Sequence, residues 1–428
     1  MLSSTDTKRG AQDYFDVNKF SFISDPVPLR YGEVHNKLQP PIPLPEDLVK
    51  RFEGGKMGIV NYAIDIVFED GSQAPLSQGY NHHYGLIMGS ADVMDDLYEK
   101  YGKEVLGSSM GGGAHLFRSL RATVEEHNKH NKDKRVASFG GGSGAEERHT
   151  AHGVAAPYAH VIDTPEKFMP LIHLINTKGA KTEAGYSPLL ECPCTPQREI
   201  DVARGLIDGK PPMPPFACNA QFLEAKNPSC SIALYEGGYR CCEHGNFLRD
   251  LNKQPVRDDE QVTTFRFKFT VEVREVSEDV VPLRPAGCCD VTGNTTHFGN
   301  IEYDVPKVSH ARMQPSSLSH CYFFIADTPI SPQCATGTPP AQCIHEATSV
   351  QPIDMALGGF GSMTRETIDP NALIDLVQIT GHLHVGGISF DLYNDATGEL
   401  LCHSVPTYGE THAAGDEKGY VVGMSRYV

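Results

Sequence analysis

The stretch "TTFRFKFTVEVREV", residues 263–276, is the most regular pattern in the chain. Apolar and polar residues alternate along it at period two, as they do in a β-strand with one buried face. The pattern therefore predicts a strand with a continuous apolar face, which would consist of Phe265, Phe267, Phe269, Val271 and Val273.

Shorter β patterns occur on both sides of this strand, and turn signals separate them. Helical patterning is sparse, although Ser90 and the acidic residues after it predict the start of one helix. The sequence thus predicts a mostly antiparallel β protein with two β-sandwich domains. We divide it into an extended N-terminal arm (1–56), a first sandwich (57–185), a Cys/Pro/Gly-rich insertion (186–260) and a second sandwich (261–428).

The charge balance excludes two classes of partner. With 37 basic and 54 acidic residues, the net charge is −17, and such a surface repels nucleic acid and anionic lipid. No apolar run is long enough to predict a membrane span. The first 20 residues lack an apolar core of signal-peptide length, so we expect either a mature chain without its signal or a chain that never had one.

The cysteines predict the compartment. There are 12, none precedes Cys192, and most lie in Pro/Gly-rich sequence. This distribution favours a disulfide framework and a secreted protein. Zinc binding is the alternative, but "CPC" and the two "CC" pairs do not have the usual C-x₂-C spacing. Asn294, in "NTT", is a glycosylation sequon that fits secretion.

Two histidine motifs are candidates for metal binding. In "QITGHLHVGG", residues 378–387, His382 and His384 would point the same way from a strand and could chelate one ion. In "GYNHHYGLIMG", residues 79–89, His82 and His83 are neighbours, which point to opposite faces of an ideal strand. The backbone must therefore twist or bulge there if both are to bind one ion.

A third candidate is His173, in the apolar run "KFMPLIHLINTKG". A buried imidazole needs a partner, which could be a metal ion or a backbone carbonyl. Taken singly, each of these histidines is more often structural than a ligand.

The order of the motifs, HH, a lone His in an apolar strand, then HxH before Gly, resembles the type-II copper monooxygenases. These are peptidylglycine α-hydroxylating monooxygenase and dopamine β-monooxygenase. The resemblance implies two jelly-roll domains and two copper ions. One copper, on His82, His83 and His173, would transfer electrons, and the other, on His382 and His384, would activate O₂. On this resemblance we predict that His173 lies close to His82 and His83. An external reductant such as ascorbate would reload both.

One position departs from that pattern. The monooxygenases supply a methionine ligand in a "DEM" context, whereas "GDEK" here has Lys418 in that place. The resemblance then leaves Met424 as a substitute ligand for the second copper, or His412 as an alternative.

A second resemblance covers more of the chain, from about residue 60 to the end. The segments "GYNHHYGL", "MPLIHLINTKG", "YRCCEHG", "GHLHVGG", "LLCHSVPTYGE" and "AGDEKGYVVGMSRY" are similar to the plant stress up-regulated nodulin family. That family is named for its expression, and the name implies no activity.

Three functions follow as hypotheses. The first is a secreted, copper-dependent monooxygenase acting on a small molecule or peptide. The second is a non-catalytic secreted protein on the same scaffold, which binds a metal, a glycan or its own copies. The third, a zinc hydrolase, is weaker because no acid lies near the HxH motif to act as a general base. The amount of bound copper would separate the first two.

Overall fold

We analysed a computed structural model of the chain. It describes residues 18–102, 120, 123–141, 150, 152–178, 200–201, 206–207, 257–283, 350, 375–381, 383 and 387–427, and for His82 and His83 it describes the backbone only. The described residues are mostly β, in several antiparallel sheets, which confirms the predicted fold class. No helix among them is long and apolar enough to cross a membrane.

The first sheet has six strands from distant parts of the sequence. Its order is β1-β12-β5-β8-β13, and β2 also pairs with β12. All neighbours are antiparallel except β8 and β13, which are parallel. The strands are β1 (Asn18–Ile23), β2 (Val27–Leu29), β5 (Lys56–Phe68), β8 (Tyr158–Asp163), β12 (Thr263–Glu275) and β13 (Val281–Pro282).

The second sheet has five strands in the order β3-β9-β6-β7, and β4 pairs with β9. All of its pairs are antiparallel. Its strands are β3 (Val34–Leu38), β4 (Ile42–Pro43), β6 (Gly79–Gly89), β7 (Ala137–Gly141) and β9 (Lys167–Asn176).

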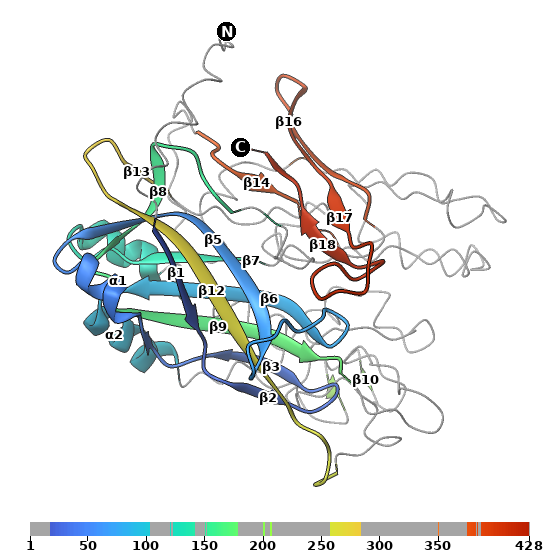
Figure 1. The fold of residues 1–428 in the computed structure, drawn as a ribbon. Coiled ribbons are helices and arrows are strands. Elements are labelled where there is room, and N and C mark those ends of the chain that lie inside the picture. Colours follow the sequence, from blue (N-terminus) through green and yellow to red (C-terminus); the bar gives the residue numbers. More distant parts are fainter. Residues whose placement is uncertain are drawn as a thin grey trace.

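The two sheets pack face to face around one apolar core, so this part of the chain is a β-sandwich (Figure 1). The five apolar residues predicted for β12 all lie in that core, and none is more than 2% exposed. They pack with residues of the facing sheet such as Leu86, Phe168, Ile172 and Leu174. The strand prediction for residues 263–276 is therefore confirmed.

The neighbours of β12 differ from those that the sequence division implied. β12 lies between β1 and β5, with Asn18 opposite Val273 and Ile23 opposite Lys268. Residues 18–43 are thus strands of both sheets and not an extended arm, and residues 263–275 belong to the sheet of β5 and not to a separate C-terminal sandwich. Alternation shows which face of a strand is buried, but it carries no information on which strands pair.

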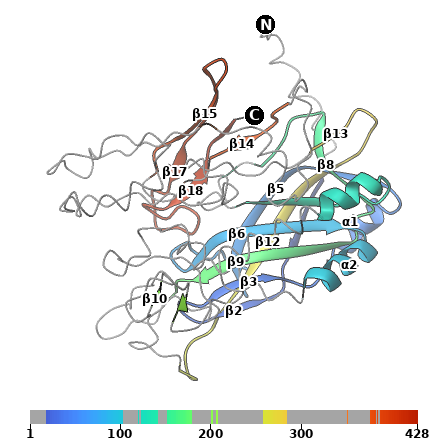
Figure 2. The ribbon, with the colours of Figure 1, turned by 180° about the vertical axis from the view of Figure 1, so that it is seen from behind.

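One helix packs against the core of the sandwich, and another covers an outer face. α1 (Glu46–Arg51) follows β4, and α2 (Ala91–Tyr101) follows β6. α2 lies against the outer face of the second sheet (Figure 2). Its buried residues Val93, Met94, Leu97 and Tyr101 pack with Ile87 of β6 and with Met169 and Leu171 of β9.

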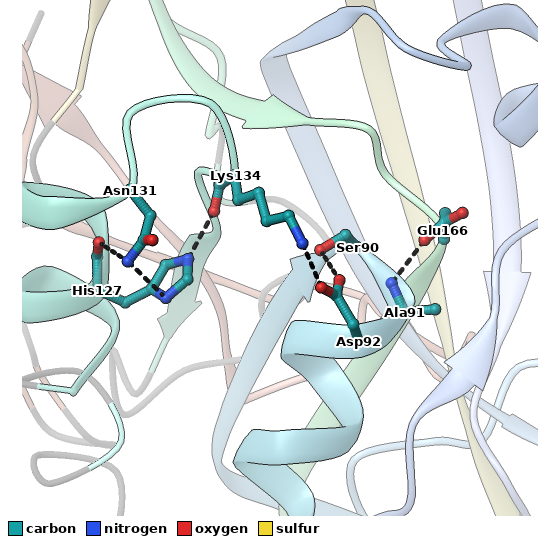
Figure 3. A network of polar contacts seen from close by, with 7 residues as sticks. All are labelled: Ser90, Ala91, Asp92, His127, Asn131, Lys134 and Glu166. Carbon is teal, nitrogen blue, oxygen red and sulfur yellow. Dashed lines mark hydrogen bonds and ion pairs between the residues drawn. The ribbon is translucent and has the colours of Figure 1, made fainter.

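The start of α2 is held by side chains from elsewhere in the chain (Figure 3). Ser90 is the N-cap residue, but its hydroxyl donates to Asp92 Oδ1 (2.6 Å) and makes no cap hydrogen bond. Instead, Glu166 Oε2 accepts the N–H of Ala91 at 2.7 Å. Asp92 also pairs with Lys134, and hydrogen bonds, first from Lys134 and then from Ser90, lower the pKa of Asp92 to about 2.

The C-terminal strands form three two-stranded antiparallel sheets, β14-β19, β15-β16 and β17-β18. They lie beside the sandwich in both views (Figures 1 and 2). Glu417, which is 6% exposed, joins the two regions by accepting the N–H of Leu76 at 2.8 Å. The strands are β14 (Ile379–Thr380), β15 (Phe390–Asn394), β16 (Glu399–Ser404), β17 (Pro406–Tyr408), β18 (Val421–Met424) and β19 (Arg426–Tyr427).

Little of the predicted cysteine-rich insertion is described. Within residues 186–260 the described residues include the short antiparallel pair of β10 (Ile200–Asp201) and β11 (Leu206–Ile207). The cysteines of the insertion fall outside the described ranges, so the disulfide framework stays a prediction.

Candidate metal site

The fold brings two of the predicted histidines into direct register. β6 and β9 are neighbours in the middle of the second sheet, and His83 lies opposite His173. Directly opposed residues of an antiparallel pair have Cβ atoms roughly 5 Å apart. Two histidines that are far apart in the sequence therefore occupy adjacent positions in the sheet.

The β6 backbone has a bulge where the histidine pair requires one. Asn81 lies opposite Leu174 and His83 lies opposite His173, so His82 is the extra residue between two successive pairs. In a β-bulge, two residues of one strand oppose a single residue of the other. His82 and His83 together thus oppose His173, and the regular alternation that would separate neighbouring residues is broken at this point.

His173 is buried on the outer face of the second sheet. Phe168, Ile172 and Leu174 of β9 face the sandwich core, whereas Met169 and Leu171 face α2. By strand alternation His173 belongs to the second set, two positions beyond Leu171. Its side chain is only 4% exposed, so the imidazole is buried, as its sequence context predicted. The residues opposite it on the two neighbouring strands are Asn36 and His83.

The predicted second site is described only at its margins. His382 and His384 lie outside the described residues, but Leu383 between them packs against Val421 and Met424. Met424 is 2% exposed and belongs to this small apolar cluster. The structure thus gives the Met424 side chain a packing environment. His412 is exposed, in the loop between β17 and β18.

The remaining predicted positions give no further site residue. Asn294 falls in a range that the structure does not describe, as do the cysteines other than Cys402. Cys402 is a buried thiol whose Sγ donates to the carbonyl oxygen of Ile379 at 3.9 Å. Among the side chains that the structure describes, no three His, Cys, Asp or Glu residues are grouped to hold a metal ion. His82 and His83 are not among those side chains.

The structure also reveals buried and partly buried histidines that the motifs did not indicate. His35 lies on β3 opposite Leu174, and its pKa is lowered to about 4, first by burial and second by Lys37. His152 and His160 contact the ring of Tyr62 at the edge of the sandwich. These three histidines stand outside any HH or HxH motif, and nothing in the local sequence distinguishes them from surface histidines.

The fold and the positions of His82, His83 and His173 define the class of protein. It is a β-sandwich whose second sheet has a β-bulge at a histidine pair, opposite a buried histidine. The chain belongs to the Stress up-regulated Nod 19 family, whose model matches residues 16–321 and 359–427. The predicted resemblance to the stress up-regulated nodulin family is thereby confirmed, whereas the resemblance to the copper monooxygenases stays a prediction. No curated protein matches the chain.

Proposed function

We propose that this protein binds copper through His82, His83 and His173. The observation that carries the proposal is the pairing of His83 with His173 next to a bulge at His82. Imidazole suits several transition metals, and among the divalent ions of the first row Cu²⁺ generally binds such sites most tightly. Bound copper would supply one-electron redox chemistry, and the protein would supply the ligands and the buried position of His173.

The fuller form of the proposal is a secreted, monooxygenase-like protein. It requires a second copper on His382 and His384, an external reductant such as ascorbate, and a small-molecule or peptide substrate. The histidine order in the sequence supports it. In this form the three-histidine site would store an electron for the second site.

One observation favours the alternative, a non-catalytic secreted protein that binds metal or its own copies. The sulfur ligand that oxygen-activating copper sites use has no clear counterpart here. Lys418 occupies the "DEM" methionine position, and Met424 packs in an apolar cluster with Leu383 and Val421.

The test is copper titration of the full chain at about pH 7.5, where most imidazoles are neutral and able to bind. His173→Asn should lower the Cu²⁺ affinity of the first site at least about tenfold, because even supporting groups of metal ligands contribute that much. The matched control is His35→Asn, which changes a partly buried histidine on the neighbouring strand β3, opposite Leu174 and not opposite His173. Circular dichroism should show that both variants fold.

The number of coppers distinguishes the two forms of the proposal. Two per chain, falling to one in the His382→Ala/His384→Ala double variant, would support the monooxygenase-like form. One copper per chain, unchanged in that variant, would leave the metal-binding alternative. Met424→Leu preserves the apolar packing. Loss of the second copper in this variant would therefore identify the sulfur as a ligand, and an unchanged copper count would leave Met424 as a packing residue. Equal affinity of wild type and His173→Asn would refute the three-histidine site itself.

A further inference from the structure

A cluster of aromatic rings fills the open edge of the sandwich between β7 and β8. Tyr62 of β5 stacks on His152, with ring centroids 4.3 Å apart and an interplanar angle of 10°. His160 of β8 lies edge-on to Tyr62 at 6.3 Å and contacts Phe139 of β7 at 5.8 Å. Phe139 in turn contacts Tyr62 at 4.7 Å. Each of the four rings therefore rests on at least one other.

The segment that carries His152 also holds the C-terminal strands. Thr150 Oγ1 accepts the N–H of Met424 at 3.0 Å, and the carbonyl oxygen of Gly153 accepts a hydrogen bond from the Arg426 guanidinium. His152 lies between these two anchor residues. A displacement of His152 from the Tyr62 ring would therefore move both attachments of the C-terminal segment.

The groups around His160 make a charge there costly. Its titratable ring contact is the phenol of Tyr62, and His152 is near enough to act on it electrostatically. Next to His152 in the sequence, the carbonyl oxygen of Gly153 accepts a hydrogen bond from the Arg426 guanidinium. A protonated His160 would be desolvated among rings, and a charge on His152 would add repulsion to that cost.

We propose that this ring cluster, made of Tyr62, Phe139, His152 and His160, is an acid-sensitive latch that releases the C-terminal strands from the sandwich edge. Protonation of His160 draws water into the cluster, separates His152 from Tyr62, and breaks the bonds of Thr150 and Gly153 to β18 and β19. The bond between Glu417 and Leu76 contains no histidine and keeps the C-terminal region attached, so release is local.

The size of the effect follows from the two states of His160. Burial first, and His152 second, lower its pKa from 6.5 to about 4 in the closed cluster. In the open cluster the pKa returns to its ordinary value, so opening becomes more favourable as pH falls from about 6.5 to about 4. Between pH 7.5 and pH 5 the opening equilibrium should rise about 30-fold.

Hydrogen exchange of the full chain, corrected for the intrinsic dependence of exchange on pH, tests the latch. In wild type, peptides covering residues 421–427 should lose protection about 30-fold between pH 7.5 and pH 5, while peptides of β12 keep theirs. His160→Phe retains a ring and cannot be protonated, so its 421–427 peptides should not respond to pH. The matched control is His403→Gln, which replaces an exposed histidine paired with Asp391 on β15 and should respond like wild type.

Three results would overturn the latch. The first is wild-type protection of residues 421–427 that stays constant to pH 5. The second is protection of residues 421–427 that still falls with pH in His160→Phe. If the phenylalanine prevents folding, His160→Gln is measured in its place, and the same result in that variant would overturn the latch. The third needs only wild type: if β12 loses protection at the same pH as residues 421–427, acid unfolds the whole sandwich and no latch exists.

Discussion

Replacement of Glu166 should weaken helix α2 more than replacement of Ser90, although Ser90 is the residue that the sequence places at the helix start. Glu166 Oε2 accepts the Ala91 N–H at 2.7 Å, whereas the Ser90 hydroxyl is directed to Asp92. Loss of a side chain that caps a helix costs about 1 kcal/mol, and loss of a negative charge near the N-terminus costs roughly 0.5 kcal/mol more. Glu166→Ala should therefore cost about 1.5 kcal/mol, since it removes both.

Native-state hydrogen exchange measures this cost locally, without assuming that a chain of this size unfolds in one step. Glu166→Ala should lower the protection of the amides in the first turn of α2 about tenfold. Glu166→Gln keeps an acceptor oxygen but loses the charge, so about a twofold to threefold loss is expected. Ser90→Ala should have a similarly small effect.

The reasoning would be refuted if Ser90→Ala lowered the protection of the first turn as much as Glu166→Ala does. It would also be refuted if Glu166→Ala left that protection unchanged while the Lys167–Asp95 ion pair nearby remained intact. In the first case Ser90 would act as the cap in solution, and in the second the helix start would not depend on the β8–β9 turn.

Two further perturbations test the sandwich itself. His35 has a pKa of about 4 in the folded protein and 6.5 when unfolded, so the stability that its neutral form provides is complete above about pH 6.5 and is lost as pH falls toward 4. Wild type should therefore lose unfolding free energy between pH 7.5 and pH 4.5, and His35→Gln should lose about 2.5 kcal/mol less over the same range in urea titrations. If wild type and the variant lose the same amount, the burial of His35 is contradicted. Gly140→Ala would place a Cβ 2.4 Å from the Tyr84 carbonyl oxygen and should lower the thermal midpoint of unfolding. The control is Gly55→Ala, whose Cβ would lie 3.6 Å from its nearest atom and whose midpoint should stay near that of wild type. Similar midpoints for the two variants would contradict the close approach of β6 and β7.

The buried face of each strand could be predicted from the sequence better than the partners of each strand. The alternation in residues 263–276 gave the inward face of β12 correctly, because burial acts on each residue of a strand separately. The pairing of β12 with β1 depends on contacts across nearly the whole length of the sandwich sequence. Local periodicity carries no information on such contacts, so it does not predict that the N-terminal strands belong to the sandwich.

In the candidate site, too, the burial of single residues could be predicted from the sequence, whereas contacts between distant residues could not. The apolar sequence around His173 predicted its burial, and the adjacency of His82 and His83 predicted that a bulge would be needed. The opposition of His83 and His173 could be expected only from the resemblance to copper proteins. The cap by Glu166 and the rings around Tyr62 could not be found at all, because each joins residues whose local sequence is ordinary.

The central place of β12 in its sheet affects how the protein can be made. A ribosome must complete residue 275 before β1 and β5 acquire the strand that lies between them. Until then the nascent chain holds two strands with unpaired backbone edges and an uncovered apolar face, while the long stretch between β9 and β12 is still being synthesised. The emerging chain must therefore be protected from other copies of itself during that interval, and a fragment that ends before residue 263 cannot close the sandwich.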